Sequence, residues 1–220
     1  MTKQEFEAIL NLHALSCKLK NTLRTGWLNW KLENVRVESV AEHIFSTSMI
    51  AVGFLATIKH NLDINKIITM IMLHETEEII IGDITLFDFE ALKTKKEKGR
   101  QAVIDIFKDF PNADHFMAII EEYEDNKTPE AKFAKQCDKL DANLQARLYE
   151  GNFNIAKVED RFFKDSRTIE AINKGYDTVS EQFLQNDIEK YSDDFLQFAK
   201  FIEDLELKEK DNYNKMNNRF

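Results

Sequence analysis

One short segment concentrates a histidine and four acids: His74, Glu75, Glu77, Glu78 and Asp83. The first two directly follow the apolar run ITMIML, where polar side chains need partners. Carboxylates this close together repel one another unless a cation or an arginine lies among them. An imidazole nitrogen combined with carboxylate oxygens suits Mn, Co, Fe, Zn or Mg. The segment therefore predicts a divalent-metal site.

Two residues on other predicted helices could complete this site. His43 lies in the first turn of a predicted helix that begins after Ser39, and Asp138 directly follows Cys137 in another. A helical bundle can bring side chains of separate helices to one ion. Taken singly, His43 is more often a capping or surface histidine, and Asp138 is more often a solvated acid. The residues alone thus indicate a metal site within 74–83 and leave both additional ligands open.

The composition favours an all-α protein. The 220 residues include only six glycines and two prolines, on which the turns of antiparallel sheets depend. Capping boxes at Thr2–Glu5 and Ser39–Glu42, and the acid Asp63, mark helix starts. We expect helices over residues 3–19, 40–55, 64–80, 101–110, 114–123, 129–148, 166–186 and 188–208.

The segments between these helices predict the domain organisation. Apolar residues show no clear periodicity over residues 21–37, which predicts an ordered loop. Gly82 predicts a helix break. Residues 85–99 predict a charged connection, part helix and part loop, and the tail from residue 208 predicts a frayed end. We expect a compact helical bundle over residues 1–165, with a C-terminal helical extension over 166–220 that packs on it.

The net charge and the lack of targeting patterns indicate which kinds of binding partner to expect. The chain carries 30 basic and 39 acidic side chains, so its net charge is 30 − 39 = −9. Such a chain has no bulk attraction to nucleic acid or anionic membranes. Its N-terminus lacks the basic-then-apolar order of a signal peptide, and no apolar run approaches ~20 residues. We expect a cytoplasmic protein with two reduced cysteines that binds neither nucleic acid nor membrane.

Three stretches resemble a known enzyme family. They are RTGW with NVRVESVAEH (24–43), LHETEEIIIGDI (73–84) and PEAKFAKQCDKLDANLQARLYE (129–150). Their order along the chain and their amino-acid sequences resemble the HD-domain metal-dependent phosphohydrolase superfamily. The resemblance is closest to its 5′-deoxynucleotidase branch, which hydrolyses deoxyribonucleoside 5′-monophosphates. The resemblance spans about two thirds of the chain and implies an all-α HD domain, one divalent ion, a small-molecule nucleotide substrate and a homodimer.

The resemblance also implies roles for individual residues. The metal ligands would be His43, His74, Glu75 and Asp138. Glu78 and Asp83 would act beside the metal, on the attacking water and the substrate. The nucleotide would contact Arg24 and Trp27, with Trp30 competing for the latter role because this loop is about two residues longer than usual. Lys135, three residues before Asp138 on one helix face, is a second candidate for a positive contact with the substrate, and a solvated lysine is the alternative.

One ligand departs from the family pattern. The family has Asp where this chain has Glu75, and the extra methylene moves the carboxylate by roughly one bond length, whereas catalytic geometry tolerates about 0.5 Å. The main hypothesis is a phosphomonoester hydrolase acting on nucleoside monophosphates. The alternatives are a hydrolase of a cyclic nucleotide, alarmone or nucleoside triphosphate, and a helical protein that keeps metal only for stability. The ligand set leaves Mn, Co, Fe and Mg open, and spacing does not reveal base or sugar preference.

Overall fold

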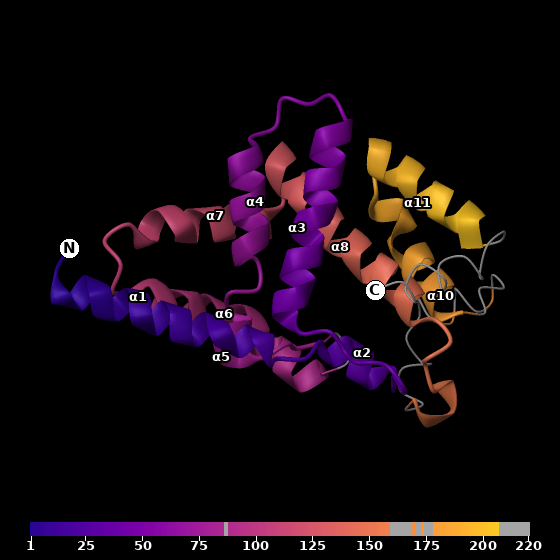
Figure 1. Cartoon of the computed structure of the whole chain (residues 1–220), viewed down its shortest axis with the longest axis horizontal. Helices are drawn as coiled ribbons and strands as arrows, with labels where there is room; N and C mark the ends of the chain where they lie inside the picture. Colours follow the sequence, from indigo (N-terminus) through magenta and orange to yellow (C-terminus); the bar gives the residue numbers. More distant parts are fainter. Residues whose placement is uncertain (86–87, 159–168, 170–172, 174–177, 207–220) are drawn as a thin grey trace. The chain divides into compact units, whose positions relative to one another are not determined.

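The computed structural model describes residues 1–85, 88–158, 169, 173 and 178–206 (Figure 1). Within these residues the regular elements are α-helices and short 3-10 helices, and two isolated bridges, Leu23–Ser39 and Leu32–Phe153, are the only β-type pairings. The predicted all-α class is confirmed.

The chain forms two compact units. The first comprises Met1–Leu28 and Val37–Cys137, and the second comprises Asn29–Arg36 with the described part of Asp138–Phe220. Helix α8 (Pro129–Tyr149) runs unbroken through the boundary at Cys137. The division predicted at residue 165 stays a prediction, because residues 159–168 lie outside the described part.

The N-terminal helices of the first unit begin where their capping residues predict. Helix α1 (Lys3–Ser16) continues into the 3-10 helix η1 (Cys17–Lys20), and α3 spans Val40–Thr57. Both capping boxes form, one between Thr2 and Glu5 and one between Ser39 and Glu42. The loop predicted at 21–37 differs in containing a short helix, α2 (Thr25–Asn29).

The helix predicted from residue 64 to about 80 is interrupted, which corrects that prediction. Asp63 caps α4, but α4 ends at Leu73 (Ile64–Leu73), and α5 (Glu78–Ile81) follows after a turn. The hydroxyl of Thr76 donates to the Leu73 carbonyl at 2.6 Å, and His74 Nδ1 lies 2.6 Å from the Ile71 carbonyl oxygen. These side chains occupy carbonyls that a continuing helix would use. Gly82, with φ 73°, then ends α5 as predicted.

The following helix is longer than predicted. Helix α6 runs from Phe89 to Phe107, because the Asp88 side chain accepts from the Ala91 N–H and caps it at the start of the charged segment. Gly99 lets α6 approach α5, since a Cβ atom there would lie 3.3 Å from Glu77 Cγ. Helix α7 (Ala113–Asp125) ends at Asn126, whose φ is 52°.

The core of the first unit joins helices distant in sequence. Residues of η1, α3, α5, α6 and α7 form one buried apolar cluster, with α1 packed on it: Leu19, Val40, Ile79, Val103, Ile106, Phe107, Ala113 and Ile120. In Figure 1, α1 runs along α6, and α3 and α4 stand side by side. Ile67, Met70 and Ile71 of α4 are fully buried. This packing fixes the C-terminal end of α4 against the N-terminal half of α3.

The second unit packs around the C-terminal half of α8. Its other elements are η2 (Ile155–Lys157), α10 (Val179–Asp187), η4 (Ile188–Lys190) and α11 (Asp193–Glu206). Asn143 donates to the Tyr191 hydroxyl at 2.5 Å, and Arg147 donates to the Ile202 carbonyl at 3.0 Å. The predicted helices 166–186 and 188–208 thus correspond to α10 and α11, while most of 166–177 and the tail from 207 lie outside the described residues.

Helix α3 is long and apolar enough to cross a membrane, judged by length and composition alone. The core helix of a soluble protein passes the same test. One side of α3 is buried inside the unit, including Val40, His43, Thr47 and Ala51, each with no exposed surface. The absence of a membrane partner stays a prediction.

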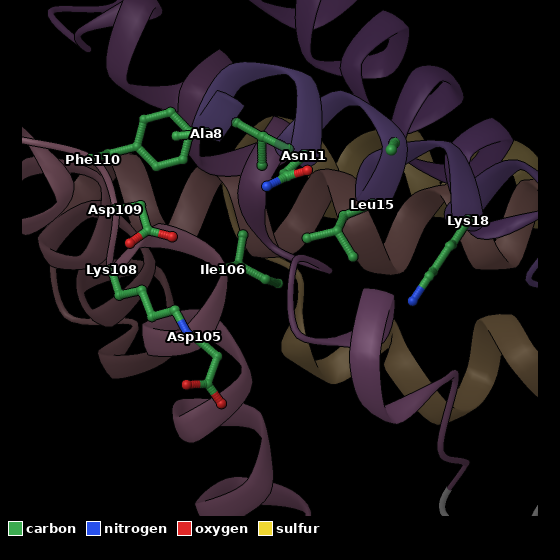
Figure 2. A pocket seen from close by; sticks show the side chains of 11 residues that line it. Ala8, Asn11, Leu15, Lys18, Asp105, Ile106, Lys108, Asp109 and Phe110 are labelled. Carbon is green, nitrogen blue, oxygen red and sulfur yellow. The ribbon is translucent and has the colours of Figure 1, made fainter. Parts of the chain in front are cut away.

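A cavity of about 430 Å³ lies in the first unit, between α1 and the C-terminal end of α6 (Figure 2). Asn11 and Leu15 line it from α1, and Asp105, Ile106 and Lys108 line it from the other side. Its lining contains none of the site residues predicted from the sequence. The cavity is therefore separate from the candidate metal centre.

The buried capping box of α3 leads to a prediction about stability. Ser39→Ala should lower the free energy of unfolding by about 1 kcal/mol, whereas Ser39→Gly should cost only about a few tenths, because glycine is tolerated at this cap. Urea unfolding measures both. Thr2→Ala, at the exposed cap of α1, is the matched control and should cost less. Equal stabilities of Ser39→Ala and the wild type would contradict this account of α3.

Candidate metal centre

His74 lies where α4 ends, and its ring is oriented by the backbone. Nδ1 is 2.6 Å from the Ile71 carbonyl oxygen, which can only accept, so Nδ1 carries the proton. In the neutral ring, Nε2 then presents a lone pair. Such a backbone bond is the usual support of a metal-binding histidine, because it fixes tautomer and ring orientation.

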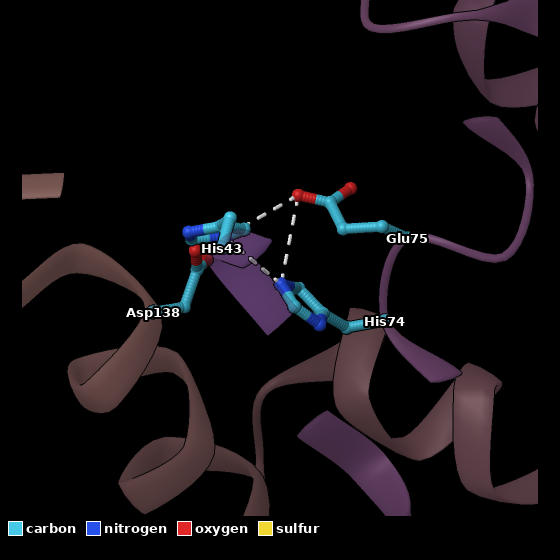
Figure 3. Close-up of side chains that lie close together, drawn as sticks. All are labelled: His43, His74, Glu75 and Asp138. Atoms are coloured by element: carbon cyan, nitrogen blue, oxygen red, sulfur yellow. Dashed lines mark hydrogen bonds and ion pairs between the residues drawn. The ribbon is translucent and has the colours of Figure 1, made fainter. Parts of the chain in front are cut away.

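His43 and Glu75 face the same point (Figure 3). His43 is fully buried in the first turn of α3, and its Nε2 lies 3.3 Å from Nε2 of His74. Glu75 Oε1 is 3.7 Å from His43 Nε2 and 3.5 Å from His74 Nε2. Two neutral imidazoles cannot direct lone pairs at each other across this distance without a shared proton or a cation between them. A proton or a cation therefore lies between the rings, and the Glu75 oxygen adds a third donor atom of a type that suits a divalent ion.

Asp138 belongs to the same group of donor atoms. It follows Cys137 on α8, the helix that runs unbroken through the boundary between the two units. Its carboxylate and the donor atoms of the other three residues all lie within 4.8 Å of one another. Ligands about 2.1 Å from one ion are separated by roughly 3.4 Å in tetrahedral geometry. The donor types of all four residues suit a divalent ion, and the 3.3–3.7 Å separations among His43, His74 and Glu75 match ligands of one ion.

Arg24 contacts Glu75, the predicted ligand that departs from the pattern of the family that the sequence resembles. Its Nη1 donates to Glu75 Oε1 at 3.1 Å, and both side chains are largely buried, at 18% and 13% exposed. This is the same oxygen that faces the two histidines. The longer glutamate therefore reaches both the centre and the arginine that was predicted to bind substrate.

Asp83 is bonded to the residue next to Arg24. Its Oδ2 accepts from the Thr25 N–H at 2.6 Å, and its carbonyl accepts from the Thr25 hydroxyl at 2.9 Å. Asp83 was predicted to act beside the metal. In this conformation its carboxylate anchors the start of α2 and hence the position of Arg24.

Glu78 and Glu77 are acids in a poorly solvated, negative environment. Burial, with the charges of Glu75 and Asp83, raises the pKa of Glu78 well above its ordinary value, opposed by Arg24 and by Lys95 of α6. Burial, with the charge of Glu75, raises the pKa of Glu77 to about 7. Both values describe the metal-free protein. A cation among these acids would lower both pKa values.

The predicted aromatic contacts to substrate are buried. Trp27 is 3% exposed, and its Nε1 donates to Glu38 at 2.7 Å. Trp30, the competing candidate, packs in the second unit against Phe153 and Phe183 with ring centroids at 6.4 and 6.0 Å. Their roles toward a nucleotide stay predictions, and in this conformation both rings serve packing.

Lys135 is directed toward α7. Its Nζ lies 3.9 Å from the centroid of the Tyr123 ring and 3.7 Å from Glu124 Oε1. Tyr123 also packs edge-on against His74, with ring centroids 5.4 Å apart. Lys135 therefore reaches the centre only through this aromatic ring, and its predicted phosphate contact stays a prediction.

Several residues around the centre were missed by the sequence analysis. Thr25 and Glu38 lie inside the stretch whose wording resembles the family, so that stretch carried a signal for them. Lys95 lies in the charged segment 85–99, where neither periodicity nor motif distinguishes it from neighbouring lysines. Only the packing of α6 against α5 reveals it.

Comparisons with known proteins show which family this chain resembles. A family model described as an HD domain matches residues 17–179. The 5′-deoxynucleotidase hdd1 of Schizosaccharomyces pombe is 31% identical over 153 residues, covering 66% of this chain and 74% of that protein. The 5′-deoxynucleotidase HDDC2 of Xenopus laevis is 31% identical over 146 residues, covering 66% and 70%. The crystal structure of the PH0347 protein of Pyrococcus horikoshii OT3 aligns with a TM-score of 0.58 and 27% identity, over 86% of this chain and 97% of that one.

The raised pKa of Glu77 leads to a prediction for the metal-free protein. The folded-state pKa of about 7 exceeds the ordinary glutamate value of 4.5, so Glu77 lowers stability as pH rises from 4.5 through 7. Glu77→Gln, measured in chelator, should therefore be more stable than the wild type at pH 8 by about 2 kcal/mol, since one pKa unit corresponds to ~1.4 kcal/mol and some exposure remains. The difference should shrink toward pH 5.

Urea unfolding at pH 5 and pH 8 measures this effect. Glu97→Gln, at an exposed position of α6, is the control and should show no such pH dependence. Saturating Mn²⁺ should reduce the advantage of Glu77→Gln, because a cation offsets the charge of Glu75. A pH-independent difference between Glu77→Gln and the wild type would refute burial as the cause.

Proposed function

Because this chain belongs to the HD domain family, we propose that it is a metal-dependent phosphohydrolase that removes the 5′-phosphate from (deoxy)nucleoside monophosphates. The observation that carries the proposal is the convergence of His43 Nε2, His74 Nε2 and Glu75 Oε1 within 3.3–3.7 Å. The similarity to proteins named 5′-deoxynucleotidases supports the choice of substrate class.

His43, His74, Glu75 and Asp138 would hold the ion. When bound, a divalent ion supplies Lewis acidity toward phosphoryl oxygens and lowers the pKa of bound water. Two buried imidazoles and two carboxylates provide a charge of about −2, which leaves a divalent centre near neutral. Such a centre would not repel a phosphate dianion as strongly as the bare acid cluster does.

The surrounding residues would divide the remaining work. Arg24, held by the Thr25–Asp83 bonds, offers guanidinium donors to phosphate oxygens, where negative charge gathers in the transition state. Glu78 would orient the attacking water and accept its proton once nearby positive charge favours its ionised form. Asp83 would position Arg24 and would hold the sugar or leaving oxygen if its carboxylate rotates from Thr25.

The substrate class is tested by phosphate release. The protein, purified and supplied with Mn²⁺ or Co²⁺, should release inorganic phosphate from deoxynucleoside 5′-monophosphates, and chelator should abolish the release. The panel should include 3′-monophosphates, a cyclic nucleotide, a guanosine tetraphosphate and a nucleoside triphosphate. Glu78→Gln should lower kcat by roughly 10²-fold or more, as expected for loss of a general base. No release from any 5′-monophosphate by folded, metal-loaded protein would refute the proposal.

Glu75 supplies an independent test of the metal centre. Glu75→Gln keeps the side-chain length and removes its charge. Loss of an outer-shell partner alone typically costs about 10–100-fold in metal affinity, so Mn²⁺ should bind at least about tenfold more weakly. Isothermal titration measures this affinity without substrate. Asp63→Asn, which preserves a capping side chain on α4, is the control; equal Mn²⁺ affinities of Glu75→Gln and the wild type would exclude Glu75 as a ligand.

A further inference from the structure

Lys95 contacts both sides of the turn that carries Asp83. Its Nζ donates to the Ile84 carbonyl at 3.3 Å and lies 3.9 Å from Glu78 Oε1. Its side chain is only 30% exposed, whereas Lys96 on the same helix is exposed. Lys95 is therefore turned inward from α6, toward the acid cluster.

Lys95 holds the turn that follows α5, residues 82–85, where backbone carbonyls accept from side chains of other elements. Gly82, with φ 73°, ends α5, so the carbonyls of the following residues lie outside the helix and its hydrogen-bond pattern. The Asp83 carbonyl accepts from the Thr25 hydroxyl, and the next carbonyl, that of Ile84, accepts from Lys95. Side chains from two separate elements, α2 and α6, thus hold two consecutive carbonyls of one turn.

Glu78 needs a neighbouring positive charge for the role proposed above. It is 2% exposed, and its Oε2 has no hydrogen-bond partner in the structure. The negative charges of Glu75 and Asp83 act on it, with the positive charges of Arg24 and Lys95 in opposition. Arg24 donates to Glu75, and Lys95 approaches Glu78 from α6, with its Nζ 3.9 Å from Glu78 Oε1.

We propose that Lys95 is a positioning residue for the hydrolysis, which holds the Glu78 carboxylate and the Asp83-bearing turn in one arrangement. This inference rests on the proposed function. Lys95 contacts neither the histidines nor Arg24 in any bond found among the described residues. Its removal should therefore act on the proton-accepting step through Glu78, because the two Thr25–Asp83 bonds still hold Arg24 in place for binding the phosphate.

The kinetic arm of the test separates kcat from KM. Lys95→Gln should lower kcat about tenfold or more, since hydrogen bonds to charged groups are typically worth that factor, while KM changes less than about threefold. Lys95→Arg should recover most of kcat, because a guanidinium can bond a carboxylate and a carbonyl together. Lys96→Gln, the exposed neighbour, should match the wild type.

The second arm needs no activity. Deuterium uptake of backbone amides in residues 82–85 should rise in Lys95→Gln, and Lys95→Arg and Lys96→Gln should resemble the wild type. Circular dichroism checks that each variant is folded. If Lys95→Gln does not fold, a comparison of Lys95→Arg with Lys95→Met tests the same loss of positive charge at this position.

The outcomes are separable. Unchanged kcat in folded Lys95→Gln overturns the proposal, as does a raised KM with unchanged kcat, which would make Lys95 a substrate-binding residue. If the wild type releases no phosphate, the proposed function fails; unchanged uptake in residues 82–85 would then also overturn the holding role of Lys95, and raised uptake would support it.

Discussion

The arrangement of the whole centre depends on the bond between His74 Nδ1 and the Ile71 carbonyl. This bond occupies the Ile71 carbonyl, an acceptor in the last turn of α4, and directs Nε2 of the His74 ring toward His43. The chain then turns, so that Glu75 faces the histidines and Glu78 begins a new helix. Had α4 continued, Glu75 and Glu78 would lie nearly on one face of a regular helix, without this separation of ligand and base. His74 thus helps Thr76 to end α4, and the same bond fixes the orientation of the His74 ring.

Charge compensation is the second constraint on the centre. Glu75, Glu77, Glu78 and Asp83 lie close together, and burial with the neighbouring negative charges favours the protonated forms of Glu77 and Glu78. Arg24 and Lys95 oppose this from two different elements, one before α2 and one within α6. Neither basic residue neutralises the cluster completely. The remaining negative charge is the electrostatic reason why the metal-free centre attracts a cation, and why the bound ion and the acids stabilise one another.

The sequence predicted the parts of the fold that depend on bonds a few residues long. The caps at Thr2, Ser39 and Asp63 and the break at Gly82 are of this kind, and all four lie where predicted. The stop at His74 was missed because apolar periodicity continues past it, and side chain-to-backbone bonds leave no periodic signal. Helix α2 was missed because its start is held by Asp83, 58 residues away. Lys95 was missed for the same reason, since its partners lie on a different element.

The contacts in and around the centre differ greatly in the length of chain that they close. Lys95 and Ile84 are separated by 11 residues, the two histidines by 31, and Thr25 and Asp83 by 58. Closing a longer loop costs more entropy, and contacts of low sequence separation generally form earlier during folding. We therefore expect the Lys95 contact to form first and Arg24 to join the acid cluster last. A partly folded chain would then contain the acid cluster without Arg24. It would bind a cation before the binding site for phosphate had formed.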